Sequence, residues 1–202
     1  MQLPNVNKNG KPYLSWSSIE LFYKNTDEWW SRYVDKKPFV PNKWTDFGSK
    51  VGQALETGNF ENFEPIEQMT LNKVVRLDNF EERVVLDFGD FEIVGFVDSA
   101  NNDFSHIIDY KTGGQGKEDK YIQPSYLQMH LYACAIRQMY GYAPNFAEVH
   151  YITRTGKNDL KVAYKSPIVL QMDIREGVLD KVEDVMFKAF QDISEYYLSR
   201  LN

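Results

Sequence analysis

Hydrophobic residues recur at helical spacing near the start of the chain and again at its end. Residues 17–37 are expected to form two helices, which begin at the N-caps Ser17 and Thr26 and end before Pro38. In the tail, over residues 173–201, apolar positions three and four apart predict one long helix with a single buried face. The chain is therefore expected to begin and end with helices.

Between these helices the pattern is mostly that of strands. A further helix is predicted from its N-cap Thr45 to Gly58, because Phe47 and Val51 open a helical period and glycine suits the left-handed residue after a helix. Runs of β-branched and aromatic residues, separated by Asp, Asn and Gly turns, then predict a series of strands. The predicted strands cover residues 69–77, 84–88, 91–97, 146–153 and 160–164, and a long helix covers residues 121–140.

Acidic residues close two neighbouring apolar runs in the middle of the chain. Asp98 follows the first run, and Asp109, Tyr110 and Lys111 follow the second. Alternate residues of a strand share a face, so Asp109 and Lys111 point one way and Tyr110 points the other. Two carboxylates that approach each other repel, and a Mg²⁺ or Mn²⁺ ion relieves that repulsion through hard oxygen ligands. Beside such an ion, a lysine orients or deprotonates a water, or offsets charge on a phosphate.

The same stretch has a plainer interpretation, because an Asp–Lys pair on an exposed hairpin contributes little. The connection between the two runs separates the alternatives. A tight hairpin centred on residues 101–102 places Asp98 and Asp109 roughly 13 Å apart at strand rise, too far to share an ion. A wide loop over residues 99–106 leaves them about 7 Å apart, so a metal site requires the wide loop.

The composition indicates one folded domain over residues 1–202. Hydrophobic residues make up 43% of the chain and aromatic residues 15%, which excludes a disordered protein. Cys134 is the one cysteine, which excludes an intrachain disulfide and a cysteine-only metal cluster. Apolar runs are too short to span a membrane and the N-terminus lacks a signal-peptide pattern, so we expect a cytoplasmic protein without membrane association.

Charge argues mildly against a broad nucleic-acid-binding surface, since the net charge is −6 and the pI about 5.2. A local surface stays compatible, because a few lysines and arginines suffice to contact phosphates. The three histidines, His106, His130 and His150, lie on separate predicted elements without metal-binding spacing. Each is expected to be structural or exposed.

Five short motifs follow one another between residues 14 and 133. They are residues 14–22 (Leu-Ser-Trp-Ser-Ser-Ile-Glu-Leu-Phe), 48–56 (Gly-Ser-Lys-Val-Gly-Gln-Ala-Leu-Glu), 95–98 (Gly-Phe-Val-Asp), 108–113 (Ile-Asp-Tyr-Lys-Thr-Gly) and 128–133 (Gln-Met-His-Leu-Tyr-Ala). Each motif alone is weak. In this order, the five together resemble the PD-(D/E)xK nuclease superfamily, and most of all its RecB-like exonuclease branch.

The resemblance implies an α/β fold like that of restriction endonucleases, with a central mixed sheet flanked by helices and a core over about residues 45–165. It implies a metal-dependent DNA nuclease of recombination, repair or phage DNA processing, with an exonuclease favoured. DNA is the implied substrate, a single-strand annealing or recombination protein is a compatible partner, and an oligomer is compatible too. The alternatives are an inactive nuclease-fold DNA-binding or assembly protein, a structure-specific endonuclease, and a glycosidase-like hydrolase with paired carboxylates.

The resemblance also assigns roles to individual residues. Asp98, Asp109 and the carbonyl of Tyr110 would hold Mg²⁺ or Mn²⁺, and Glu56 would assist as a fourth metal-binding and catalytic residue. Lys111 would orient the attacking water and offset charge on the scissile phosphate. The last motif supplies two helix neighbours that would position Lys111 or the DNA strand, Gln128 and Tyr132.

Three departures from the family pattern stand out. Gly52 occupies a position where many relatives carry a metal-ligating histidine, which leaves Glu56 to contribute directly or through water and favours the inactive alternative. Several relatives hold an iron–sulfur cluster through four cysteines, whereas residues 25–28 here are Asn-Thr-Asp-Glu and only Cys134 exists, so no such cluster is expected. Val97 replaces the proline of the family name, which is a common substitution.

Overall fold

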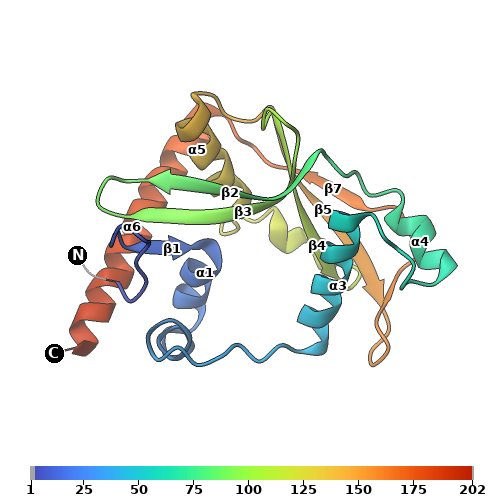
Figure 1. Ribbon diagram of the computed structural model, residues 1–202, viewed down its shortest axis with the longest axis horizontal. Helices are drawn as coiled ribbons and strands as arrows, with labels where there is room; N and C mark the ends of the chain where they lie inside the picture. The colour runs from blue at the N-terminus through green and yellow to red at the C-terminus, as the bar shows by residue number, and fades with distance from the viewer. Residues whose placement is uncertain (1–2, 202) are drawn as a thin grey trace.

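The computed structural model describes residues 3–201, and helices lie near both ends of that range (Figure 1). The first element is a short strand, β1 (Tyr13–Ser15). It is followed by α1 (Trp16–Lys24), α2 (Thr26–Trp29) and a π-helical turn, η1 (Trp30–Val34). It closes with α6 (Glu176–Leu201), which begins three residues later than the predicted helix over residues 173–201. The expectation of helices in both places is confirmed.

The predicted N-caps of three helices are wrong by one to three residues. An upstream Ser or Asn accepts the backbone N–H groups of the first turn in each case. At the third helix the predicted cap instead accepts a hydrogen bond from the backbone N–H of the true cap, as the last member of a capping box. The caps are Ser15, Asn25 and Asn42 in place of Ser17, Thr26 and Thr45.

Two helices lie between η1 and β2, although the sequence predicted only one there. α3 (Lys43–Thr57) ends at Gly58, whose φ of 68° is the left-handed conformation expected there. Where a strand was predicted over residues 69–77, the chain forms α4 (Pro65–Leu71). Pro65 suits the first position of a helix, and Glu67 accepts a hydrogen bond from the backbone N–H of Glu64 (2.9 Å), so local capping overrides the strand-like composition.

A mixed sheet forms the centre of the molecule, as the resemblance implied. β1 runs parallel to β3 and β4 runs parallel to β5, whereas the other neighbouring strands are antiparallel. Two of the strands were not predicted, β1 and β7. Besides β1, the strands are β2 (Asn79–Asp87), β3 (Glu92–Ala100), β4 (His106–Gly113), β5 (Phe146–Thr155), β6 (Lys161–Val162) and β7 (Ile168–Gln171).

The sheet splits along one edge of β3. The opposite edge pairs with β2 from residue 92 to residue 100, with Glu81 as the one unpaired position. The split edge pairs with β1 only at residues 92–94 and with β4 only at residues 99–100. The middle of this edge is therefore left open between β1 and β4, and Asp98 lies beside the opening.

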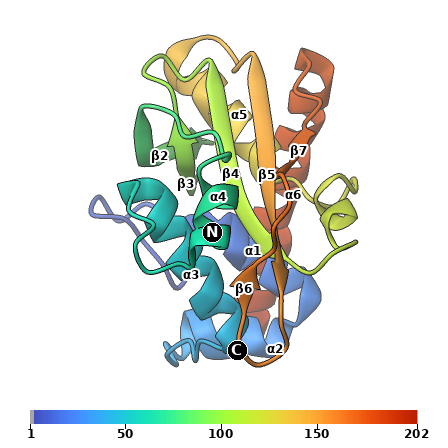
Figure 2. The same ribbon diagram turned by 90° about the vertical axis from the view of Figure 1, so that its right-hand side faces the viewer.

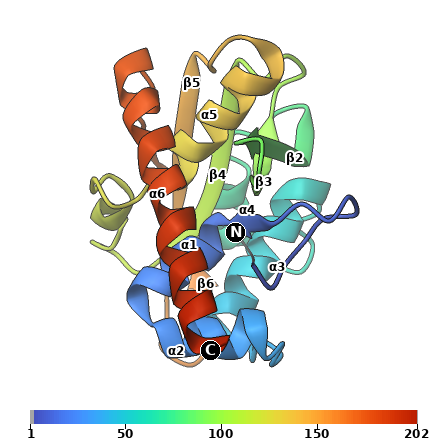
Figure 3. The ribbon, with the colours of Figure 1, turned by 90° about the vertical axis from the view of Figure 1, so that its left-hand side faces the viewer.

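Helices cover both faces of the sheet (Figures 2 and 3). α5 (Gln128–Tyr140) and α6 pack together on one face, and α3 and α4 lie on the other. α5 begins seven residues later than predicted, because Pro124 lies in the loop after a short 3-10 helix, η2 (Glu118–Tyr121). It ends before the left-handed Gly141, as expected.

Two hydrophobic clusters correspond to these two layers. The larger cluster joins the sheet to α5 and α6, and includes Ile93, Val97, Met129, Ile136 and Phe190. The smaller cluster lies under α3 and α4, and includes Val51, Leu55, Leu71, Ile152 and Val162. Within residues 3–201, none of the helices combines the length and the apolar character needed to cross a membrane.

Candidate active site at the split of the sheet

The register of β3 and β4 places two carboxylates opposite each other. Ser99 pairs with Ile108 and Ala100 with Ile107, so the next pair in the same register is Asp98 with Asp109. Neither predicted connection is correct, because residues 99, 100 and 106 lie in the strands and only residues 101–105 form the loop. Asp98 and Asp109 are thus closer in register than the tight hairpin or the wide loop would have placed them.

The loop is held by Asn101 and by one left-handed residue. The backbone N–H of Asn101 donates to the carbonyl of His106 (3.1 Å), and its side-chain oxygen accepts from the His106 N–H (2.9 Å). Phe104 has a φ of 55° and is buried, which completes the reversal of the chain. This combination of backbone and side-chain hydrogen bonds cannot be read from the turn-like composition alone.

Beyond Ser99 the two strands separate, and the side chain of Asp98 occupies the gap. Its Oδ2 accepts a hydrogen bond from the backbone N–H of Tyr110 (2.7 Å), which would otherwise pair with a strand. Burial, followed by repulsion from Asp109, raises the pKa of Asp98 to about 7. The site therefore gathers more negative charge than its own cations neutralise.

Lys111 lies on the same face of β4 as Asp109, as the strand alternation predicted. Its Nζ is 2.8 Å from one carboxylate oxygen of Asp109 and 2.7 Å from the other. Asp109 is fully buried, whereas the Lys111 side chain keeps 24% of its surface exposed. Burial alone would lower the pKa of Lys111, but Asp109 and Asp98 raise it above the ordinary value.

Glu56 approaches from the last turn of α3. It lines a hollow of about 400 Å³ together with Asp98 and Lys111, which we call the α3 hollow. A carboxylate is unfavourable at a helix C-terminus, and Arg76 offsets this cost by donating hydrogen bonds to the carbonyls of Leu55 and Glu56. Gly52, one turn earlier, lines the same hollow.

Glu81 is a fourth acid at the site that the sequence did not reveal. It stands opposite Asp98 across the β2–β3 pair, and its φ of 53° interrupts the ladder there. Burial and the nearby carboxylates of Glu56 and Asp109 raise the pKa of Glu81. The predicted strand over residues 84–88 begins after Glu81. The sequence therefore provided no reason to expect Glu81 opposite Asp98.

A hydrogen-bonded row of side chains supports Asp109 from α5. The Nε2 of Gln128 donates to the hydroxyl of Tyr132 (2.7 Å), and the hydroxyl of Tyr126 donates to Oε1 of Gln128 (2.7 Å). The Tyr126 hydroxyl also lies 3.5 Å from Oδ2 of Asp109. Gln128 and Tyr132 are thus neighbours as predicted, and Tyr126, expected only as an apolar helix position, is the link to the carboxylate.

This row borders a second hollow, of about 490 Å³, which we call the β3 hollow. Glu81, Asp98 and Lys111 line both hollows and so lie where the two meet, whereas Asp109 is buried behind them. Lys120 also borders the β3 hollow, from the 3-10 helix η2. The β3 hollow and the α3 hollow thus give access to Glu81, Asp98 and Lys111 from two sides.

The donor chemistry of the site fits a divalent cation. Asp98 and Asp109 are hard oxygen donors held opposite each other, and Mg²⁺ commonly takes one or two carboxylates and completes its shell with water or phosphate. Among residues 3–201, no three His, Cys, Asp or Glu side chains are placed to hold a metal ion together. A direct ligand set of two carboxylates, Asp98 and Asp109, is compatible with both observations.

Two of the histidines meet in space, although the sequence offered no spacing that joined them. The Nε2 atoms of His106 and His150 lie 3.0 Å and 2.9 Å from the same oxygen of Glu148. These contacts hold the pKa of Glu148 below its usual value, against the opposing effect of burial. The trio joins β4 to β5 through side-chain hydrogen bonds.

Comparison with known proteins agrees with this architecture. A family model for the PD-(D/E)XK nuclease superfamily matches residues 17–196. No curated protein matches the chain. Among solved structures, the crystal structure of a "putative exonuclease" from Eubacterium rectale is similar, with a TM-score of 0.59 and 11% sequence identity over 94% of this chain and 85% of that chain. At that identity the likeness concerns the fold alone.

Proposed function

The chain belongs to the PD-(D/E)XK nuclease superfamily, and from that premise we propose that it is a Mg²⁺- or Mn²⁺-dependent DNA nuclease that acts as an exonuclease. The observation that carries the proposal is the placement of Asp98 opposite Asp109, with Lys111 against Asp109. The name of the Eubacterium rectale protein supports the exonuclease preference. We also propose the cytoplasm as its compartment and a recombination or single-strand annealing protein as its partner.

The proposed ion would be held by Asp98, Asp109 and the carbonyl of Tyr110, with Glu56 assisting through water. When bound, a divalent cation supplies Lewis acidity toward the scissile phosphate and activates water. The raised pKa of Asp98 supports this assignment, because burial, followed by repulsion from Asp109, disfavours its charged form, and a cation relieves both effects.

Lys111 is proposed to stabilise charge and to orient the attacking water. An amine that contacts both oxygens of a carboxylate does so as an ammonium, so Lys111 is suited to donate hydrogen bonds and unsuited to accept a proton. The water oxygen forms the new bond to phosphorus while the bond to the leaving sugar oxygen breaks. The attacking water releases one proton to solvent and the leaving oxygen takes one up from solvent, so the protons balance. Charge that grows on the phosphate is offset by the ammonium.

The α5 row is proposed to position Asp109. Gln128 and Tyr132 contact each other, and Tyr126 carries the row to within 3.5 Å of Asp109. A carboxylate supported in this way keeps one orientation while Lys111 turns toward the DNA. The expectation was that Gln128 and Tyr132 position Lys111 or the DNA strand, and we propose that they act on Lys111 through Asp109. Both residues also line the β3 hollow, so a contact with the DNA strand stays part of the proposal.

Asp109→Asn and Lys111→Ala test the proposal. We expect each to reduce Mg²⁺-dependent cleavage of linear DNA by roughly 10²-fold or more, because each removes charge next to the reacting phosphate. Cleavage is measured with end-labelled DNA in Mg²⁺ and in Mn²⁺, and circular dichroism checks the fold. Asp90→Asn, which changes an exposed carboxylate in the β2–β3 turn, is the matched control and should leave cleavage unchanged.

Substrate topology tests the exonuclease assignment. We expect wild-type protein to degrade linear DNA and to spare covalently closed circles and end-blocked DNA. Cleavage of circles at the rate of linear DNA would instead identify an endonuclease. Full activity in both Asp109→Asn and Lys111→Ala would contradict the catalytic site itself, and an inactive wild type that still binds DNA would support the inactive DNA-binding alternative.

A further inference from the structure

A third hollow lies on the sheet beyond the candidate active site. This outer hollow has a volume of about 670 Å³ and shares Tyr13, Val94 and Phe96 with the β3 hollow. The shared residues place the two hollows side by side along β3, and we call the pair the trough. At strand rise, the six steps from Glu92 to Asp98 span about 20 Å, so the trough is long enough for a few nucleotides.

The floor of the trough exposes an aromatic ring in the middle of a strand. Along β3, the side chains of Ile93 and Val97 are buried under α5, whereas Phe96 is 50% exposed. A single exposed aromatic residue is ordinary on a protein surface. Phe96 is different because it lies in a hollow that leads to the carboxylates, two residues before Asp98.

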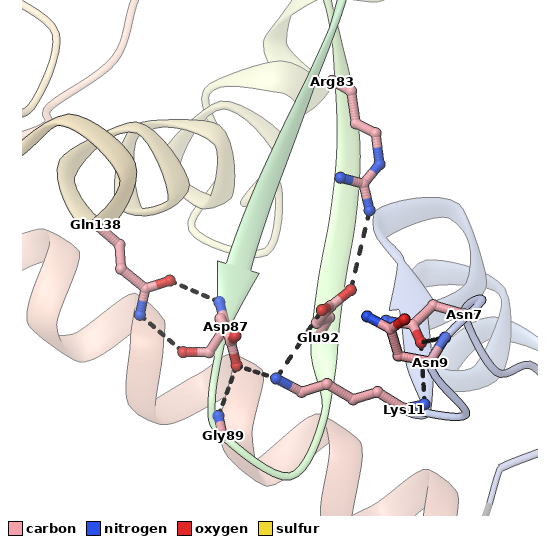
Figure 4. Close-up of polar contacts among 8 residues, drawn as sticks. All are labelled: Asn7, Asn9, Lys11, Arg83, Asp87, Gly89, Glu92 and Gln138. Atoms are coloured by element: carbon pink, nitrogen blue, oxygen red, sulfur yellow. Dashed lines mark hydrogen bonds and ion pairs between the residues drawn. The ribbon is translucent and has the colours of Figure 1, made fainter.

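Two cations, Arg83 and Lys8, and one carboxylate, Glu92, line the outer hollow. Arg83 pairs with Phe96 across β2 and β3, and its side chain is 52% exposed. Lys8 lines the same outer hollow and is also exposed. Arg83 reaches the carboxylate of Glu92 only at 3.9 Å, so its guanidinium keeps hydrogen-bond donors for a phosphate (Figure 4).

We propose that this trough binds a single-stranded end of the DNA substrate, an inference that rests on the proposed nuclease function. Phe96 provides the surface on which a base stacks, and Arg83 and Lys8 contact the phosphates that follow. A duplex stacks its bases on one another and has no free base face to offer within the molecule, whereas every unpaired base has one. The trough therefore selects single-stranded over double-stranded DNA and guides the strand toward Asp98.

Binding in the absence of metal tests the stacking role separately from cleavage. Fluorescence anisotropy with a labelled oligothymidylate and with a hairpin duplex is measured in EDTA. Phe96→Ala should weaken single-strand binding by about tenfold, the effect of removing the stacking surface for one base, and should leave duplex binding unchanged. Phe96→Trp should keep or tighten binding, and Tyr164→Ala, which removes an exposed aromatic side chain elsewhere, is the matched control.

Salt dependence tests the role of Arg83 at the phosphates. Arg83→Gln should reduce the slope of log affinity against log salt by about 0.7, because the variant neutralises one phosphate fewer on a single strand. Arg175→Gln removes an exposed arginine at the start of α6 and should leave the slope unchanged. An unchanged slope in Arg83→Gln would remove Arg83 from the proposed path.

The outcomes separate this inference from the proposed function. Wild-type protein that binds oligothymidylate, with Phe96→Ala weakened, but cleaves nothing would overturn the nuclease proposal and support the binding trough. If wild-type protein cleaves DNA but Phe96→Ala binds single strands as tightly as wild type, the proposal that the trough binds a single strand is wrong. The nuclease proposal is then unaffected. Equal weakening of single-strand and duplex binding would overturn the selection of single strands.

Discussion

The left-handed backbone at Glu81 is an unfavourable conformation placed among the carboxylates. A residue with a Cβ in this conformation costs about 1–2 kcal/mol relative to an ordinary strand conformation, and glycine avoids that cost. Such strain is concentrated at functional sites in proteins, where surrounding contacts impose it. At Glu81 the neighbouring pairs, Phe80 with Ser99 and Glu82 with Val97, hold the strand on both sides.

Glu81→Gly and Glu81→Gln separate the strain from the charge. Both remove the carboxylate, but only glycine relieves the backbone, so Glu81→Gly should be more stable than Glu81→Gln by about 1 kcal/mol. Urea unfolding in EDTA measures the free energies of unfolding. We expect both variants to cleave DNA more slowly than wild type, because Glu81 lines both hollows at the site. Equal free energies of unfolding for Glu81→Gly and Glu81→Gln would show that the backbone at residue 81 is not strained.

At the scale of elements, the site depends on the contact of β3 with α5. A Cβ added at Gly95 would lie 2.2 Å from Cε1 of Tyr132, so only glycine lets the tyrosine ring lie flat against the strand. Tyr132 in turn accepts the hydrogen bond from Gln128, and the row continues to Asp109 through Tyr126. Gly95 of the motif at residues 95–98 and Tyr132 of the motif at residues 128–133 thus pack directly against each other.

Gly95→Ala should disturb this contact. The added methyl forces the Tyr132 ring to move, which we expect to cost about 1–3 kcal/mol of unfolding free energy and to slow DNA cleavage. Gly177→Ala is the matched control, because Gly177 lies in α6, a Cβ there meets no atom within 4 Å, and alanine in a helix is favoured over glycine by roughly 0.5–1 kcal/mol. Thermal and urea unfolding measure the stability of both variants. A Gly95→Ala variant as stable as wild type would contradict the close packing of Tyr132 against Gly95.

At the scale of the molecule, the active site lies between two layers of unequal size. The larger hydrophobic cluster holds the sheet against α5 and α6, where Leu179 and Phe190 are fully buried. The smaller cluster holds α3 and α4, and α3 carries Glu56. The carboxylates Asp98 and Asp109 thus belong to the larger layer, and Glu56 belongs to the smaller one.

Amide hydrogen exchange should report this difference. We expect the amides of α3 and α4 to exchange faster than those of α5, β4 and β5, because a layer with less buried apolar surface opens at a lower free energy. Mass spectrometry of peptic fragments measures the rates in EDTA. If the amides of α5 exchange as fast as those of α3, the two layers do not differ in their free energy of opening and the prediction is wrong.

Much of this protein is determined by its sequence at short range. Alternation within β4 was enough to place Asp109 and Lys111 on one face, and Gly58 and Gly141 marked the ends of α3 and α5. The five motifs likewise pointed to the mixed sheet and to the superfamily. The strand alternation and the helix ends depend on residues close together in the chain, whereas the mixed sheet and the superfamily followed from the resemblance that the five motifs carry.

Only the tertiary structure decided how the acids meet. The register of β3 with β4 brought Asp98 opposite Asp109, and the register of β2 with β3 brought Glu81 to the same place. Local capping formed a helix over residues 65–71, which takes up the first three residues of the strand predicted over residues 69–77. A strand slipped by one residue keeps its own alternation, so register is fixed by packing between distant segments and cannot be read from one strand.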